Sequence, residues 1–267
     1  MRWAIAIAAA AAAAAMGAAY AHAQAPDRPQ PLPGPPPRGY LGEAGPDAMQ
    51  ILPPAPAKGD ARDAADRRVF RETRALQGTP RWTLATDDDH VTVLKQFSCA
   101  VGIELSRERN AKLYALLLRV GRDFSTVAGA AKDGFRRPRP FLIDKGPTCI
   151  PQTDPSLNSF DYPSGHATTG WTFGLMLTEL APDRATPILV RARAYTESRY
   201  VCGVHTLSAV EAGRTTASIV WAAEHGSAEF RHDLEEARAE LAAARASAPK
   251  PDPAACAKEA TLLATPK

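Results

Sequence analysis

Residues 106–131 read SRERNAKLYALLLRVGRDFSTVAGAA, and this stretch decides the fold class. Its apolar side chains recur at intervals of three and four residues, the spacing that places them on one face of an α-helix. Ser106 is of a residue type that caps helix N-termini. The stretch therefore predicts a long amphipathic helix that packs by one face against a core. That face consists of Leu113, Leu116, Leu117, Val120, Phe124 and Val127.

Further helical patterns lie on both sides of this stretch. No convincing alternation of apolar and polar residues predicts a strand. We therefore predict an all-α fold, with one helical-bundle domain of about six or seven helices over residues 60–248. Residues 249–267 are predicted to form a frayed C-terminal tail. The other expected helices cover residues 60–76, 87–100, 166–180, 184–201, 208–225 and 227–246.

The composition fits a globular protein of ordinary size. The chain has 267 residues, and 45% of them are hydrophobic, which is enough to form a core and excludes collagen-like, coiled-coil and wholly disordered chains. The net charge of +3 is small and the basic residues form no stripe, so we expect no nucleic-acid partner. The oligomeric state stays open, a homo-oligomer included.

The first residues have the pattern of an export signal. Arg2 precedes an Ala-rich apolar run, and Ala21-His22-Ala23 resembles a cleavage site, so residues 1–23 are predicted to be a signal peptide. A membrane anchor is the alternative, but the run is shorter than the roughly 20 residues that span a bilayer. We expect a periplasmic or secreted protein without stable membrane insertion after cleavage. Residues 24–59 are rich in proline and are predicted to form a flexible arm.

Four cysteines are far apart in the sequence: Cys99, Cys149, Cys202 and Cys256. None forms a CxxC pair, so a zinc site is not expected. In an oxidising compartment an even number predicts one or two disulfides, and buried free thiols are the alternative. Four cysteines allow three pairings, and the sequence does not choose among them.

Three polar clusters carry the chemistry. The first, residues 132–140, reads KDGFRRPRP and ends the long helix, because proline breaks helices. The guanidinium groups form planar forks that match phosphate oxygens, and the lysine adds a compact charge. Alone, the cluster fits a solvated basic loop equally well.

The second cluster, residues 162–168, reads YPSGHAT and precedes an apolar helix. A helix N-terminus presents unpaired N–H groups and partial positive charge, which suit an anion. Ser164 adds a hydroxyl, Gly165 permits close approach of a ligand, and His166 can donate a proton. The third cluster, residues 198–205, places Arg199 and His205 at a junction between two helices.

Together the three clusters hold the groups needed to move a phosphoryl group without a metal or another cofactor. The sequence has no HxH, HExxH or DxD metal motif and no Gly-rich nucleotide loop. The carboxylate run Asp87-Asp88-Asp89 is interpreted as the solvated start of a helix.

In order, the clusters match K-x6-R-P, P-S-G-H and S-R-x5-H, and the chain resembles the type 2 phosphatidic acid phosphatase and vanadium haloperoxidase superfamily. An expected signal peptide without membrane spans is similar to its soluble branch, the bacterial class A non-specific acid phosphatases. The resemblance covers residues 60–230 and implies the same all-α fold.

The resemblance also implies the activity and its residues. The chain is expected to be an acid phosphatase that hydrolyses small phosphate monoesters through a phosphohistidine, with a mildly acidic optimum and no metal. His205 is expected to attack phosphorus and His166 to protonate the leaving oxygen. The phosphate is expected to lie on Lys132, Arg139, Ser164, Gly165 and Arg199.

One position departs from the family pattern. Four residues after His205 the family has an aspartate that orients the nucleophilic imidazole, and this chain has Ala209. Glu211 and Ser208 are the expected substitutes. Loss of an orienting acid lowers turnover by roughly four orders of magnitude in serine proteases. A phosphate-binding protein without turnover is therefore one alternative function, and a lipid phosphatase and a vanadate haloperoxidase are the others.

Overall fold

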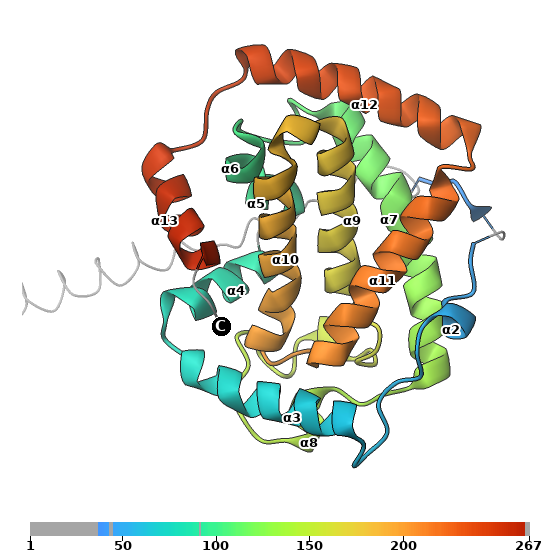
Figure 1. Ribbon diagram of the computed structural model, residues 1–267, viewed down its shortest axis with the longest axis vertical. Coiled ribbons are helices and arrows are strands. Elements are labelled where there is room, and N and C mark those ends of the chain that lie inside the picture. Colours follow the sequence, from blue (N-terminus) through green and yellow to red (C-terminus); the bar gives the residue numbers. More distant parts are fainter. Residues whose placement is uncertain (1–36, 43–44, 91, 265–267) are drawn as a thin grey trace, which may run out of the picture.

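The computed structural model describes residues 37–42, 45–90 and 92–264 (Figure 1). The expected signal peptide and the most proline-rich part of the expected arm lie outside these residues. The described residues are mainly helical and contain no strand, which confirms the all-α fold. No helix in these ranges is long and apolar enough to span a membrane.

The longest helix is α7 (Ala111–Phe135), and it buries the predicted apolar face. It begins after Asn110 rather than at Ser106, because the Ser106 hydroxyl accepts a hydrogen bond from the Arg109 N–H and closes a separate turn. The helix ends at Arg136, whose backbone is left-handed with φ 51°. This turn directs the following basic residues back toward the bundle.

The centre of the bundle is formed by α9 (Gly165–Leu180) and α10 (Ala185–Val201), which lie side by side in Figure 1 and are joined by the 3-10 turn η4 (Pro182–Arg184). Both helix boundaries agree with the prediction to within one residue. α11 (Leu207–Glu224) packs against α9 and α10. Gly213 of α11 allows this approach, because a Cβ there would lie 2.6 Å from the Ser164 carbonyl oxygen.

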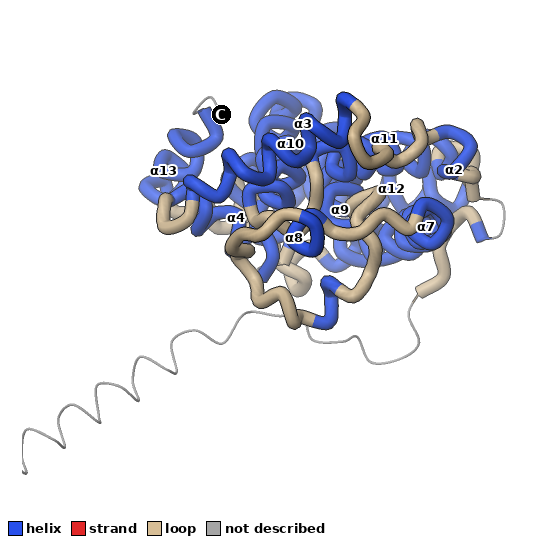
Figure 2. Tube along the Cα trace, turned by 90° about the horizontal axis from the view of Figure 1, so that it is seen from below, coloured by secondary structure: helices blue, strands red, loops and turns tan. Residues whose placement is uncertain are grey.

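The remaining helices surround this centre. α12 (Ala228–Ser247) packs on α7, and α3 (Ala61–Thr73), continued by η2 (Arg74–Leu76), packs on α11 and α10. Between α7 and α9 the chain is mostly loop, with α8 (Pro140–Ile143) and η3 (Pro155–Leu157). This segment lies at the lower end of the bundle in Figure 1, the end that faces the viewer in Figure 2.

Two sequence predictions about the ends of the domain are wrong. The expected frayed tail contains α13 (Pro253–Ala264), which Cys256 attaches to the bundle. The expected arm contains α2 (Ala48–Ile51), which packs on α7.

The expected single helix over residues 87–100 is also wrong, because α4 (Pro80–His90) already includes the three aspartates at its C-terminal end. The one-turn helices α5 (Val93–Gln96) and α6 (Ser98–Val101) follow it.

All four cysteines are paired, as the even number predicted. Cys99 bonds Cys256 and joins α6 to α13. Cys149 bonds Cys202 and joins the loop before α9 to the end of α10. The second disulfide therefore ties the loop between the first and second polar clusters to the third cluster, which contains Cys202.

Candidate active site

The three polar clusters meet at the lower end of the bundle in Figure 1, where α7 and α10 end and α9 and α11 begin. A cavity of about 240 Å³ opens there. Its polar lining includes Lys132, Arg139, His166 and His205, which come from all three clusters. Phe124 of α7 contributes an apolar wall.

His205 is brought to the cavity by a sharp turn after α10. Gly203 adopts φ 76°, and the His205 N–H then donates to the Arg199 carbonyl at 3.3 Å. The ring is buried, with Nδ1 2.8 Å from the Asp161 carbonyl oxygen and 3.0 Å from Asp161 Oδ1. Because both neighbours of Nδ1 are acceptors, Nδ1 carries the proton. Nε2 then carries the lone pair of the ring, which accepts a hydrogen bond from Arg139 Nη1 at 3.0 Å.

Asp161 is a site residue that the sequence analysis missed. It is fully buried, and Thr206 holds both carboxylate oxygens: its N–H donates to Oδ1 at 3.1 Å and its hydroxyl donates to Oδ2 at 2.6 Å. The Arg137 guanidinium lies 3.6 Å from Oδ2. The position of Asp161, directly before the second cluster, was the signal in the sequence that could have identified it.

The two residues expected to orient His205 lie elsewhere. Ser208 donates from its hydroxyl to Asp66 Oδ2 at 2.5 Å and accepts from Arg137 at 2.7 Å. Glu211 is exposed on α11. The prediction that either one contacts the His205 ring is therefore wrong, because the carboxylate at Nδ1 comes from the loop before α9 and not from α11.

Lys132 and Arg139 provide positive charge beside His205. The Lys132 ammonium donates to the Phe160 carbonyl at 2.6 Å, and burial, followed by repulsion from Arg139, lowers the pKa of Lys132 to about 8. Arg139 is fixed by the Ser159 carbonyl at 2.8 Å and the Val204 carbonyl at 2.8 Å. Burial lowers the pKa of Arg139 to about 10, so both groups are charged at neutral pH.

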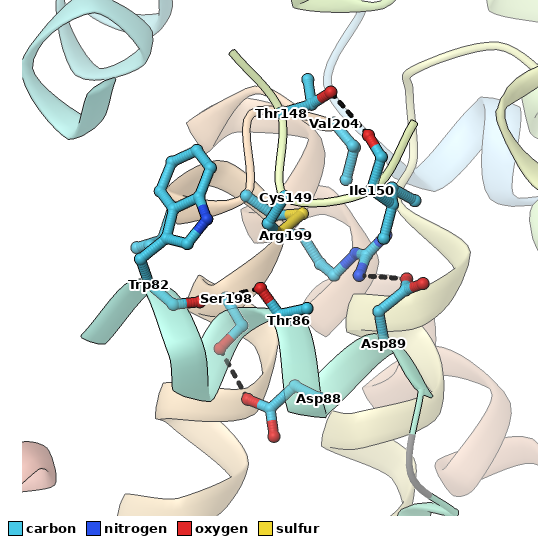
Figure 3. Close-up of a disulfide and its surroundings, with 12 residues drawn as sticks. Trp82, Thr86, Asp88, Asp89, Thr148, Cys149, Ile150, Ser198, Arg199 and Val204 are labelled. Carbon is cyan, nitrogen blue, oxygen red and sulfur yellow. Dashed lines mark hydrogen bonds and ion pairs between the residues drawn. A yellow bond between two sulfur atoms is a disulfide. The ribbon is translucent and has the colours of Figure 1, made fainter. Parts of the chain in front are cut away.

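Arg199 is paired with a carboxylate of α4. Its Nη1 donates to Asp89 Oδ1 at 2.6 Å. Figure 3 marks this ion pair with a dashed line. Its buried Nε has no hydrogen-bond partner among the described residues. A buried guanidinium N–H without an acceptor is costly, and an anion oxygen would satisfy it.

The aspartate run of α4 is therefore not a solvated helix start, as the sequence suggested. Asp88 is buried, forms an ion pair with Arg191 and accepts from the Ser198 hydroxyl at 2.6 Å (Figure 3). Asp89 lies 3.6 Å from His166 Nε2 as well as beside Arg199. Only Asp87 of the three is exposed.

His166 lies at the N-terminus of α9. Ser164 caps this helix by accepting from the Ala167 N–H at 3.3 Å, and a Cβ on Gly165 would meet no atom within 4 Å. The His166 side chain is 40% exposed. Arg199 and burial lower the pKa of His166, and Asp89 opposes them. The neutral form of the ring is therefore favoured in this site.

The pKa of His205 is lowered well below its usual value, first by burial and then by the charges of Arg139 and Lys132. A neutral imidazole nitrogen thus faces a group of cations. This arrangement suits attack on a phosphate held by those cations. Among the described residues, no group of three His, Cys, Asp or Glu side chains is placed to hold a metal ion.

The chain is similar to known proteins. Residues 112–231 match the family described as the PAP2 superfamily. A solved transmembrane PAP2-type phosphatidylglycerolphosphate phosphatase from Bacillus subtilis aligns with 67% of this chain and 89% of its own, with 18% identity and a TM-score of 0.47.

Three curated relatives share more sequence. An acid phosphatase from Zymomonas mobilis is 42% identical over 79% of this chain and 81% of its own length. A non-specific acid phosphatase from Salmonella typhimurium is 32% identical over 71% of this chain and 78% of its own. A non-specific acid phosphatase from Providencia stuartii is 32% identical over 73% of this chain and 81% of its own length. The chain therefore belongs to the bacterial class A non-specific acid phosphatases of the PAP2 superfamily.

Proposed function

We propose that this acid phosphatase hydrolyses small phosphate monoesters through a covalent phosphohistidine at His205. The observation that carries the proposal is the orientation of the His205 ring. Nδ1 faces two acceptors, and Nε2 lies 3.0 Å from Arg139 at a cavity that Lys132 and His166 also line.

In the first step the phosphate group binds to Lys132, Arg139 and the free Nε–H of Arg199, near the N-terminus of α9. The Nε2 lone pair of His205 forms the N–P bond as the bond between phosphorus and the leaving oxygen breaks. The leaving oxygen takes a proton from His166 and departs as an alcohol. The cations neutralise charge that develops on the non-bridging oxygens.

In the second step water attacks the phosphohistidine. His166, now neutral, accepts a proton from the water as the P–O bond forms. The N–P bond breaks, and its electron pair returns to Nε2. Inorganic phosphate leaves, and the neutral His205 ring is restored with its proton on Nδ1.

The Ala209 departure is the basis of the alternative in which the protein binds phosphate without turnover. Asp161 weakens that alternative, because a carboxylate lies 3.0 Å from His205 Nδ1 despite the alanine. We therefore favour a working phosphatase.

The test is a phosphate-release assay on the purified mature protein, with p-nitrophenyl phosphate and an alkyl phosphate, in the presence of EDTA. We expect turnover of both substrates, and loss of turnover in His205→Asn. Phosphate binding by calorimetry without hydrolysis would instead favour the non-catalytic alternative. Parallel assays with a phosphatidic acid vesicle, and with vanadate, peroxide and bromide, distinguish the lipid phosphatase and haloperoxidase alternatives.

We further propose that the protein is exported to the periplasm. Residues 1–23 have the charge and cleavage pattern of a signal peptide, and two disulfides suit an oxidising compartment. N-terminal sequencing of protein from a periplasmic extract should find a chain that starts after Ala23. A full-length chain in the cytoplasmic fraction would contradict the proposal.

A further inference from the structure

The imidazole of His205 keeps a carboxylate partner although position 209 is alanine. We propose that Asp161, from the loop before α9, has taken over the positioning role that the family assigns to the fourth residue after the nucleophilic histidine. This inference rests on the proposed function, because it assigns a role within the same reaction.

The geometry meets the requirements of that role. Asp161 Oδ1 lies 3.0 Å from His205 Nδ1, on the side of the ring opposite to Nε2. The carboxylate cannot turn away freely, because Thr206 donates to both of its oxygens. Thr206 is also the residue that caps α11. The carboxylate, the ring and the start of α11 are thus held as one unit.

The main chain supports the same arrangement. The Asp161 N–H donates to the Arg137 carbonyl at 2.8 Å, and the Ser164 N–H donates to the Ala209 carbonyl at 2.9 Å. Ala209 itself is fully buried in the apolar core. The main chain of Ala209, where the family has its aspartate, therefore holds the segment that carries Asp161.

A layer of charges behind Asp161 makes a buried carboxylate tolerable at this position. Arg137 lies 3.6 Å from Asp161 and donates to Asp66 Oδ2 at 2.8 Å and to Asp63 Oδ1 at 3.3 Å. Both aspartates belong to α3. The charged or titratable groups that act on the His205–Asp161 pair from other elements are Lys132, Arg137, Arg139, His166 and Arg199. Asp63 and Asp66 face the pair through their ion pairs with Arg137.

Two oxygen atoms of Asp161, the main-chain carbonyl oxygen and carboxylate Oδ1, face the His205 ring and have different roles. Its carbonyl oxygen, 2.8 Å from Nδ1, is sufficient to fix the tautomer. Its carboxylate adds a negative charge that stabilises the ring when Nε2 becomes bonded to phosphorus and the imidazole becomes cationic. Loss of the carboxylate alone should therefore slow the chemistry without reversing the tautomer.

The two roles also predict a pH signature. Burial raises the pKa of Asp161 to about 6, against the lowering effects of Thr206 and Arg137. The charged form is therefore lost as the pH falls through about 6, and kcat should fall with it.

The first experiment compares Asp161→Asn with Asp183→Asn, an equal charge change at an exposed ion pair in η4. In Asp161→Asn we expect kcat to fall between about 10-fold and 100-fold, since a hydrogen bond to a charged group is replaced by a neutral one. KM should change less than kcat, and the acidic limb near pH 6 should disappear. The wild type and the two variants are assayed with the same substrate, so the ionisation of the substrate affects all three pH profiles equally. Wild-type kcat with an unchanged acidic limb in Asp161→Asn would overturn the proposal.

The second experiment restores the carboxylate at the family position. Asp161→Ala should lose more activity than Asp161→Asn, and addition of Ala209→Asp to Asp161→Ala should recover at least about tenfold in kcat. A folded double variant without recovery would contradict the idea that the two positions are interchangeable.

A readout without turnover keeps the proposal testable if the double variant does not fold. In full-length protein labelled with ¹⁵N-histidine, the Nδ1 proton of His205 should shift as the pH passes through about 6 in the wild type. It should not shift in Asp161→Asn. Identical titrations in both proteins would overturn the proposal. If wild-type protein shows the shift but hydrolyses no monoester, the proposed function fails and the pairing of the two residues stands.

Discussion

Arg199 and Asp89 form an ion pair beside the candidate active site, with 2.6 Å between Nη1 and Oδ1, while the buried Nε of Arg199 has no acceptor among the described residues. The same carboxylate lies 3.6 Å from His166 Nε2. Asp89 therefore acts on both the cation that should hold the substrate and the histidine that should protonate the leaving group. We expect its negative charge to weaken phosphate binding but to support the protonated form of His166.

Replacement of Asp89 by asparagine should separate these effects. Removal of a negative charge from the site should tighten inhibition by inorganic phosphate by up to about tenfold. It should also lower kcat for alkyl phosphates, because Asp89 raises the pKa of His166 and supports its protonated form. Inhibition and steady-state assays measure the two, with exposed Asp87→Asn as the control. Weaker phosphate binding in Asp89→Asn would contradict this account.

His166 should matter most for poor leaving groups. In His166→Gln we expect kcat for an alkyl phosphate to fall by about 10²–10⁴-fold, the usual contribution of a positioned acid. The loss for p-nitrophenyl phosphate should be much smaller, because that leaving group departs without protonation. Equal losses for both substrates would show that His166 does not act as the acid.

Lys132 should set the basic limb of the pH profile. Its ammonium is charged below its pKa of about 8 and neutral above it, so kcat/KM should fall as the pH rises through about 8. Lys132→Arg should move this limb upward by at least about one pH unit, because a guanidinium keeps its charge. An unchanged limb in that variant would assign the limb to another group.

The two disulfides should differ in their effect on activity. Cys149–Cys202 ties the end of α10, near Arg199, to the loop that carries Ser156 and Ser159, which accept hydrogen bonds from Arg139. Replacement of both cysteines by serine should lower thermal stability and lower kcat/KM by about tenfold or more.

The matched control is the double serine variant of Cys99 and Cys256, which joins α6 to α13 away from the cavity. It should lower the melting temperature but leave kcat/KM within about twofold of wild type. Equal losses of activity in the two double variants would contradict a local role for Cys149–Cys202.

Glu224 should make stability depend on pH. Burial, followed by the charge of Asp123, raises the pKa of Glu224 to about 9. The protonated form is favoured in the folded protein, so its stabilising effect is complete below pH 4.5 and is lost as the pH rises toward 9. Glu224→Gln should raise the free energy of unfolding at pH 8 by roughly 1–3 kcal/mol. Chemical denaturation measures this, with exposed Glu211→Gln of the same helix as the control. A destabilised Glu224→Gln would show that the carboxyl is ionised in the fold.

Local patterns in the sequence predicted most of the helices. The boundaries of α9, α10, α11 and α12 follow from apolar periodicity and from breakers such as Pro182. The pattern failed at α4 and α13. Asp88 resembles a solvated residue until Arg191 is known to pair with it, and Cys256 holds α13 through a partner 157 residues away. Both contacts are long-range, and no local pattern contains them.

In the candidate site, too, local motifs were predictable from the sequence and long-range contacts were not. Sequence motifs identified Lys132, Arg139, His166 and His205, and the structure brings these four to one cavity. The sequence did not identify Asp161, because its role depends on a contact with a residue 44 positions later. The family pattern places the carboxylate on the helix that follows His205, whereas the fold supplies one from the loop before α9.

Trapping the covalent intermediate tests most directly whether His205 is the nucleophile. Protein mixed with labelled monoester is quenched rapidly into base, in which phosphohistidine is stable, and is digested for mass spectrometry. We predict one phosphoryl group on His205, formed at least as fast as turnover and absent in His205→Asn. An active enzyme that carries no label on His205, or that carries it on another residue, would contradict the account.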